Sequence, residues 1–110
     1  MTHSLSPLPD HAFETDVLTS EIPVLIDVTA RWCGPCRAQL PIVERIAAQL
    51  AGRVRVLILD VDEAPVTATR LGIRGAPTLI LFAGGREIAR HVGLTPETIV
   101  RRMLEPALAT

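Results

Sequence analysis

The stretch that decides the fold reads ARWCGPCR and covers residues 30–37. Its thiols, Cys33 and Cys36, lie three positions apart and are the only cysteines in the sequence. Three positions correspond to about one helical turn, so the two sulfur atoms come within reach of a disulfide bond if a helix begins at the first of them. A β-branched run precedes this stretch and an amphipathic run follows it, which places the pair between a strand and a helix.

The predicted helix gives the two thiols different chemistry. Cys33 lies at its N-terminus, where free N–H groups and the positive end of the helix dipole stabilise a thiolate. Arg31 and Arg37 add positive potential. Cys33 is therefore the expected nucleophile, and Cys36, expected to be more buried and less acidic, is the resolving thiol. Pro35 stiffens the loop between them.

Hydrophobic periodicity predicts alternating strands and helices on either side of this stretch. The expected strands cover residues 23–28, 54–61, 78–82 and 86–92. The expected helices cover residues 11–19, 33 or 34 to 51, 65–71 and about 96–105. This order predicts an α/β fold with a central mixed sheet of four to five strands and helices on both faces, parallel at the start and ending in an antiparallel hairpin.

Three residues bound or bend these helices. We expect Asp10 to cap the first, Pro41 to kink the second without breaking it, and Pro106 to end the last near Glu105. Residues 1–9 are expected to form an irregular lead-in or a short edge strand, and residues 10–110 a single domain.

Composition narrows the classes of function. The chain of 110 residues is 48% hydrophobic and 21% charged, which is typical of a globular domain, and no apolar run reaches the ~18 residues of a membrane span. A net charge of −1 gives no basic footprint for nucleic acid or an anionic membrane. All 11 basic residues are arginines, which excludes lysine chemistry. The first ten residues do not resemble a signal peptide, so we expect a reducing, cytoplasmic setting.

Residues 30–37 resemble the active-site segment of the thioredoxin family. Residues 71–78 (LGIRGAPT) resemble the family's loop with a cis-proline, and residues 82–85 (FAGG) resemble its next β-turn. The resemblance extends over residues 13–104 and implies the thioredoxin fold. It also implies a protein disulfide reductase that acts through a mixed disulfide, binds no cofactor itself and is recycled by an NADPH-linked thioredoxin reductase. We take a monomer as the default state.

The resemblance also implies roles for residues outside the cysteine pair. Pro77 would be the cis-proline and would bend the Ala76 backbone toward the substrate beside Cys33. Trp32, Ala76, Pro77 and Gly93 would form an apolar groove for an extended peptide around a target disulfide.

Asp27 interrupts an apolar strand, and its expected desolvation raises its pKa. We therefore expect it to accept and donate a proton for Cys36. The chain departs from the family at two nearby positions, because Ile58 stands where a lysine is frequent and Thr29 where an aromatic residue is usual. Ile58 should give Asp27 less relief from burial, and Thr29 should leave lighter packing behind the active site.

Three alternative readings remain open from the sequence. A structural zinc site would need two ligands besides the cysteines, and His3, His11 and His91 are scattered without helical pairing. A redox-inactive binding or scaffold module of the same fold would not require both thiols. An oxidant or isomerase would differ in redox poise, and Gly34-Pro35 between the cysteines resembles the reducing members, whose potential is about −270 mV.

Overall fold

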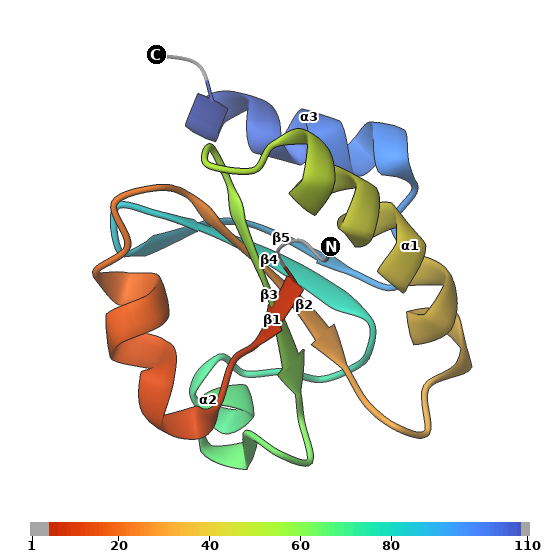
Figure 1. The fold of residues 1–110 in the computed structure, drawn as a ribbon. Helices are drawn as coiled ribbons and strands as arrows, with labels where there is room; N and C mark the ends of the chain where they lie inside the picture. The colour runs from red at the N-terminus through yellow and green to blue at the C-terminus, as the bar shows by residue number, and fades with distance from the viewer. Residues whose placement is uncertain (1–4, 109–110) are drawn as a thin grey trace.

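The computed structural model describes residues 5–108, through which one mixed sheet runs (Figure 1). Its strands are β1 (Leu5–Pro7), β2 (Val24–Thr29), β3 (Arg55–Asp60), β4 (Thr78–Ala83) and β5 (Arg86–Val92), in the spatial order β1-β3-β2-β4-β5. β1 and β2 each pair with β3 in parallel, whereas β4 runs antiparallel to both β2 and β5. The predicted mixed sheet, with its parallel start and hairpin finish, is confirmed.

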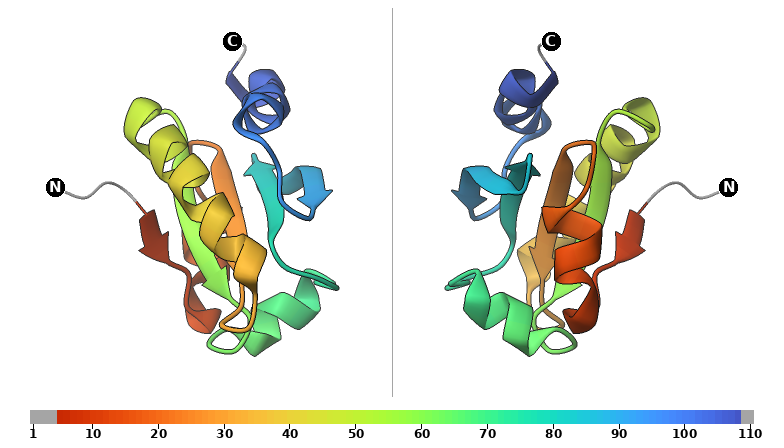
Figure 2. Two further views of the ribbon diagram at one scale, coloured as in Figure 1. Left: turned by 90° about the vertical axis from the view of Figure 1, so that its right-hand side faces the viewer. Right: turned by 90° about the vertical axis from the view of Figure 1, so that its left-hand side faces the viewer.

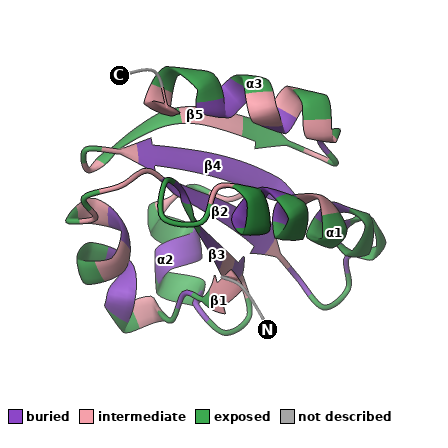
Figure 3. Cartoon of the chain, turned by 45° about the horizontal axis from the view of Figure 1, so that its top comes forward, coloured by how far each residue is buried: buried purple, intermediate pink, exposed green. Residues whose placement is uncertain are grey.

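Helices cover both faces of this sheet, as predicted. Two long helices, α1 (Gly34–Gln49) and α3 (Glu97–Leu108), lie on one face. The other face carries α2 (Pro65–Arg70) and two short N-terminal turns, η1 (Asp10–Ala12) and η2 (Glu14–Leu18). The two panels of Figure 2 view these two helical layers from opposite sides. The three-layer arrangement encloses the central strands, and β2 and β4 are buried along most of their length (Figure 3).

The alternation of side chains along β2 divides the core into two halves. Val24, Ile26 and Val28 belong to the hydrophobic cluster under the N-terminal turns, whereas Leu25 belongs to the cluster under α1 and α3. Burying each of these side chains contributes roughly 1.5–3 kcal/mol. Because side chains two positions apart share a face, Asp27 projects on the same side as Leu25, toward α1. The strand pattern therefore places a carboxyl beneath the helix that carries the cysteines.

The N-terminal helix differs from the prediction in two ways. Residues 10–18 form a 3-10 turn and a π-helical turn in place of an α-helix over 11–19. Asp10 does not cap its own turn. Its carboxylate accepts hydrogen bonds from the backbone N–H groups of Val66 (3.1 Å) and Thr67 (2.8 Å), so it caps α2. The residue at the N-cap of α2 is Ala64, which has no side-chain acceptor, and the distant carboxylate takes its place.

Pro41 and Pro106 both lie inside helices. α1 continues through Pro41 without a break, as predicted, and ends at Gln49 before Gly52, which adopts a left-handed φ of 84°. The prediction that Pro106 ends α3 is wrong, because the helix continues to Leu108. Pro106 occupies the last turn, where its missing N–H removes only one backbone bond.

The N-terminal segment and the β4–β5 hairpin agree with the sequence pattern. Residues 5–7 form a short edge strand beside β3, one of the two forms expected for this segment, and residues 1–4 lie outside the described residues. Gly84 and Gly85 form the turn between β4 and β5 with φ angles of 61° and 79°. A Cβ atom at Gly85 would lie 2.8 Å from the backbone oxygen of Leu18, so this turn requires glycine both for its conformation and for its contact with η2.

Candidate active site

The first turn of α1 holds the cysteine pair. Cys33 and Cys36 are joined by a disulfide, with their Cα atoms 5.4 Å apart. Cys33 is the N-cap residue in an extended conformation, and its Sγ accepts a hydrogen bond from the backbone N–H of Cys36 at 3.2 Å. Gly34 and Pro35 fill the first helical positions, where a proline has no intrahelical bond to lose. A free N–H of the helix thus points at the sulfur predicted to be the nucleophile.

The two cysteines are buried to the same degree. Cys33 is 5% exposed and Cys36 is 6% exposed, so the prediction that Cys36 is the more buried residue is wrong. The disulfide holds both in one small apolar cluster with Ala30, against which Val61 and Ala76 pack. What distinguishes the two residues is their place in the helix, because Cys33 receives an N–H bond and Cys36 provides it.

The loop before β4 lies against this cluster. The Ala76–Pro77 peptide bond is cis, in agreement with the expectation for Pro77. The carbonyl of Pro77 accepts a hydrogen bond from the N–H of Gly93 at 2.8 Å. Gly93 has a φ of 94°, and open space surrounds the position where a Cβ would stand. A backbone hydrogen bond therefore joins Pro77 and Gly93, two predicted groove residues that are 16 positions apart. A third, Ala76, packs against the cysteines.

Trp32 forms one wall of an apolar depression next to the disulfide. Trp32 is the one tryptophan of the chain, and it is 70% exposed. Such exposure is unusual for a large aromatic residue and excludes a role in the core. A cavity of about 220 Å³ extends from it and is lined by Trp32, Val61, Ala68, Thr69, Ile73, Arg74, Gly75 and Ala76. Val92 and Leu94 are also exposed, on either side of Gly93. Exposed apolar side chains thus flank Gly93, one of the predicted groove residues.

Asp27 lies beneath the same cysteines. It is 2% exposed, and its Oδ1 atom has no hydrogen-bond partner among the described residues. Burial raises the pKa of this carboxyl from 3.8 to about 7, as expected for a desolvated acid. A cavity of about 240 Å³ is lined by Asp27, Thr29, Ala30, Arg31, Cys33, Cys36, Arg37, Leu40 and Ile58. The carboxyl and both sulfur-bearing residues therefore share one cavity.

The two departures from the family pattern meet at this cavity. Ile58 is the register partner of Asp27 on the neighbouring parallel strand, so an aliphatic side chain stands beside the carboxyl. Thr29 lines the same cavity and also a second one of about 440 Å³, bounded by Pro7, Leu8, Pro9, Thr29, Ile58, Asp60 and Glu63. Thr29 thus lines two cavities behind the active site, and the lighter packing expected there stays a prediction.

The arginines near the cysteines contribute unequally. Arg31 lies 3.7 Å from Glu63, and both side chains are largely exposed. This exposed pair offsets part of the positive charge that Arg31 was expected to bring to Cys33. Arg31 and Arg37 both line the cavity of Asp27 and the cysteines, so both add to the positive potential of the helix N-terminus.

One residue beside the site has no counterpart among the sequence-based expectations. Gln39 is completely buried, and its side-chain amide pairs with the backbone of Thr95. A signal was present, because Gln39 falls on the inner face of α1 with Cys36, Val43 and Ile46, where the helical period favours an apolar residue. A polar residue at such a position must find a partner, which periodicity cannot identify.

Two other kinds of feature are missing from the described part of the chain. Within residues 5–108, no three His, Cys, Asp or Glu side chains gather in a group that could hold a metal ion. Nor does any helix in that range combine the length and the apolar composition needed to cross a membrane. The cysteines themselves are bonded to each other.

Comparison with known proteins gives one consistent family. The sequence model of the thioredoxin family matches residues 4–105. The chain is 48% identical over 99 residues to a thioredoxin of Synechocystis sp., which covers 90% of this chain and 92% of that protein. It is 43% identical over 108 residues to a thioredoxin of Acidithiobacillus ferridurans, covering 98% and 100%. Thioredoxin M4, chloroplastic, of Arabidopsis thaliana is 41% identical over 98 residues, or 89% and 51% of the two chains.

The fold, the cysteine pair and these relatives agree. A match to nearly the whole chain and identities above 40% leave the redox-inactive module unsupported. The bonded cysteines lie at the helix N-terminus in the geometry that thiol–disulfide exchange requires. The chain therefore belongs to the thioredoxin family and is a thiol–disulfide reductase.

Proposed function

We propose that this protein reduces disulfide bonds in other proteins, with Cys33 as the nucleophile, Cys36 as the resolving thiol and Asp27 as the proton acceptor and donor. The observation that carries the proposal is the shared cavity at the N-terminus of α1, which joins the two cysteines to a buried carboxyl. Gly34 and Pro35 support the active site by closing the turn between the thiols.

In the first step the Cys33 thiolate attacks one sulfur of the target disulfide. A bond forms between Cys33 and that sulfur, the target bond breaks, and the other target sulfur leaves as a thiolate. The N–H of Cys36 and the N-terminus of α1 favour the ionised Cys33, because they donate a hydrogen bond and present a positive dipole end. The attack can therefore proceed near neutral pH.

In the second step Cys36 resolves the mixed disulfide. Its thiol gives its proton to the Asp27 carboxylate and attacks the Cys33 sulfur, which restores the Cys33–Cys36 disulfide and expels the second target sulfur as a thiolate. Two electrons have then passed from the dithiol to the target. A carboxyl whose pKa is raised to about 7 by burial exists in both protonation states at neutral pH, which suits a group that accepts and returns a proton.

The target disulfide would reach Cys33 along the groove of Trp32, Ala76, Pro77 and Gly93. The cis-proline loop packs against the cysteines and offers the Ala76 backbone for hydrogen bonds to an extended peptide. The exposed Trp32 ring supplies apolar contact area beside it. These properties favour a polypeptide over a small polar molecule as the substrate.

The oxidised protein would then be recycled by an NADPH-linked thioredoxin reductase. On this proposal the chain carries electrons in its cysteine pair alone, without a cofactor of its own, and acts as a monomeric single domain over residues 10–110. The cytoplasm is the proposed setting, because its reducing thiol pool suits a donor with a low potential.

A trapping experiment tests the assignment of the two thiols. Reduced Cys36→Ser protein incubated with insulin should form a 1:1 mixed disulfide, visible by mass spectrometry and released by dithiothreitol. The matched Cys33→Ser protein keeps one thiol in the same turn and should form no adduct. Trapping by Cys33→Ser alone would reverse the roles, and trapping by neither would contradict the proposed reaction.

A further inference from the structure

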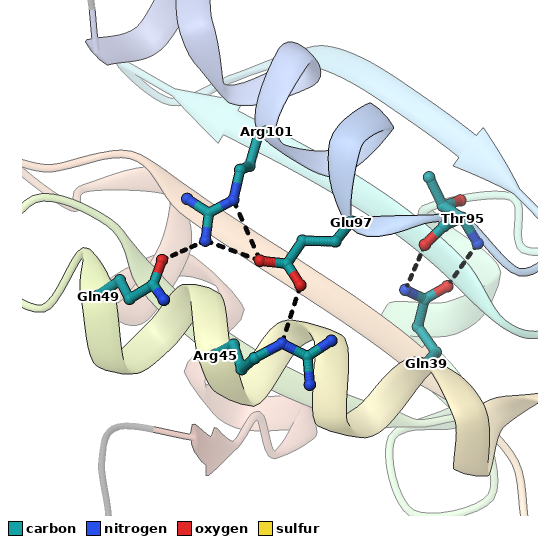
Figure 4. Close-up of polar contacts among 6 residues, drawn as sticks. All are labelled: Gln39, Arg45, Gln49, Thr95, Glu97 and Arg101. Atoms are coloured by element: carbon teal, nitrogen blue, oxygen red, sulfur yellow. Dashed lines mark hydrogen bonds and ion pairs between the residues drawn. The ribbon is translucent and has the colours of Figure 1, made fainter.

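Within residues 5–108, Gln39 makes the only side-chain contact in which one buried amide holds both backbone groups of a distant residue. Its Nε2 donates to the Thr95 carbonyl at 3.0 Å, and its Oε1 accepts from the Thr95 N–H at 2.8 Å (Figure 4). The Gln39 side chain is 0% exposed, and the two residues lie 56 positions apart. A paired donor and acceptor fix both the position and the orientation of the Thr95 peptide, which an apolar contact would not do.

This contact connects the cysteine helix to the substrate groove. Gln39 lies one turn beyond Cys36 on the inner face of α1. Thr95 donates its hydroxyl to the carbonyl of Gly93 at 3.0 Å, and Gly93 in turn donates its N–H to the carbonyl of Pro77 at 2.8 Å. An unbroken series of hydrogen bonds therefore runs from the helix that carries the thiols to the loop that faces them.

The other polar contacts between α1 and α3 differ in both place and kind. Arg45 of α1 donates to Glu97 of α3 at 2.8 Å, and Arg101 of α3 contacts Gln49 of α1 while it also bonds Glu97 within its own helix (Figure 4). These contacts are partly or fully exposed and lie two or more turns from the cysteines. They join the two helices through side chains alone, so these side chains can change conformation without displacing the groove. Gln39 binds the backbone at the groove wall itself.

We propose that Gln39 is a positioning residue for protein substrates: it fixes the Gly93–Thr95 wall of the groove relative to the Cys33–Cys36 pair. This inference rests on the proposed function, in which the groove binds an extended polypeptide. A protein substrate must contact the groove wall and present its disulfide to Cys33 at the same time. The distance between the wall and Cys33 therefore affects how well such a substrate binds. A small disulfide reagent reaches Cys33 without using that wall. Gln39 therefore acts on recognition and leaves the thiol chemistry unchanged.

The test replaces Gln39 by methionine, which keeps the length and volume of the side chain but removes both hydrogen bonds. Two substrates are compared, insulin as the protein disulfide and 5,5′-dithiobis(2-nitrobenzoate) as the small one. Gln39→Met should raise KM for insulin about tenfold, because the groove wall is no longer held in its position relative to Cys33, with kcat nearly unchanged. The rate with the small reagent and the reduction potential should match those of the unmodified protein.

Val43→Ala is the matched control, because Val43 is equally buried on the same face of α1 and takes no part in the groove. It should lower stability while leaving the ratio of the two activities unchanged. If Gln39→Met also leaves that ratio unchanged, Gln39 only stabilises the fold and the inference is wrong. If the unmodified protein reduces the small reagent but not insulin, the proposed function fails instead, so the two failures are distinguishable.

Gln39→Glu and one spectroscopic signal provide an independent check. At neutral pH the Glu side chain retains an acceptor for the Thr95 N–H but loses the donor to its carbonyl. The insulin KM should again rise selectively, and the ¹⁵N–¹H signals of Gly93 and Thr95 should shift in both Gln39 variants. Unshifted Gly93 signals would overturn the coupling between α1 and the groove.

Discussion

The two sides of the disulfide differ in what determines their properties. The front is the side of the Pro77 loop and Gly93, and the back is the side of Asp27. In front, the Pro77 loop and Gly93 are fixed by a short backbone hydrogen bond and by close packing against the cysteines. Behind, Asp27 lies in a cavity where its Oδ1 atom has no hydrogen-bond partner among the described residues, and Thr29 lines this cavity and a second one. The front thus fixes geometry through hydrogen bonds to backbone atoms. The back sets a pKa through the side chains beside Asp27, so we infer that proton transfer can be tuned there without changing recognition.

The largest expected effect comes from removing the charge behind the disulfide. Asp27 has a pKa raised by burial from 3.8 to about 7, so the folded protein holds a proton that the unfolded chain releases. Stability should therefore be highest below about pH 4 as far as this group is concerned, fall as the pH rises to about 7, and stay low above it. At pH 8, Asp27→Asn should be more stable than the unmodified protein by up to about 4 kcal/mol.

Urea unfolding of the oxidised protein between pH 3 and pH 9 measures this difference. The variant should lack the decline between pH 4 and pH 7. A flat profile for the unmodified protein over that range would mean that burial does not raise the Asp27 pKa.

A cation beside Asp27 should have the next largest effect. Ile58→Lys places an ammonium next to the carboxyl, which should lower its pKa by roughly one to three units. The pH midpoint of the Cys36 resolution step should move down with it, because Asp27 must be ionised to accept the proton. ¹³C NMR titration of the carboxyl measures the first change and stopped-flow kinetics the second. Ile58→Met is the uncharged control, and equal titration curves for the two variants would contradict the proposed control by side-chain charge.

A change in front of the disulfide should have a smaller effect on stability. Gly93→Ala places a side chain at a φ of 94° where space is open, so only backbone strain opposes it, at about 1–2 kcal/mol. Gly34→Ala is the matched control, because the same open space surrounds a position without a left-handed φ. Urea unfolding compares the two variants. Gly93→Ala should also impair insulin reduction more than reduction of a small disulfide, and equal impairment would argue against a groove on this side.

The smallest expected effect lies away from both regions. Asp10→Ala removes the carboxylate that caps α2 and should lower stability less than the other variants do. The Asp27 titration and the activity ratio should not change, because neither depends on that contact. Thermal unfolding of Asp10→Ala beside Asp62→Ala, another acidic side chain outside the site, measures the cap. Equal stability of the two variants would show that the cap contributes nothing.

Prediction from the sequence succeeded where residues close together in the chain determine the feature. The β-branched run of β2 and the spacing of Cys33 and Cys36 each depend on a few neighbouring positions. The carboxyl of Asp27 stood out because an acid within an apolar strand must be desolvated when that strand is central, and Asp27 is indeed buried. Local patterns of this kind predict the structure well, because the hydrophobic period and the secondary-structure propensity of neighbouring residues determine the element directly.

Sequence reasoning failed where the decisive partner lies far along the chain. Asp10 caps a helix that begins 55 residues later, and Gln39 pairs with a backbone 56 residues away, so no local pattern identifies either partner. Pro106 shows a related limit, because a proline in a last helical turn removes too little to end the helix. The cavities that Thr29 lines depend on the packing of segments distant in sequence, which no local pattern measures.

The equilibrium reduction potential of the Cys33–Cys36 pair tests the central claim most directly. Titration against a dithiothreitol or glutathione series, followed by the fluorescence of Trp32, should give one reversible two-electron transition near about −270 mV. That value would establish a donor of reducing equivalents built on this fold. A potential of about −120 to −180 mV would make the protein an oxidant or isomerase, and the absence of a transition would contradict the redox role of the cysteine pair altogether.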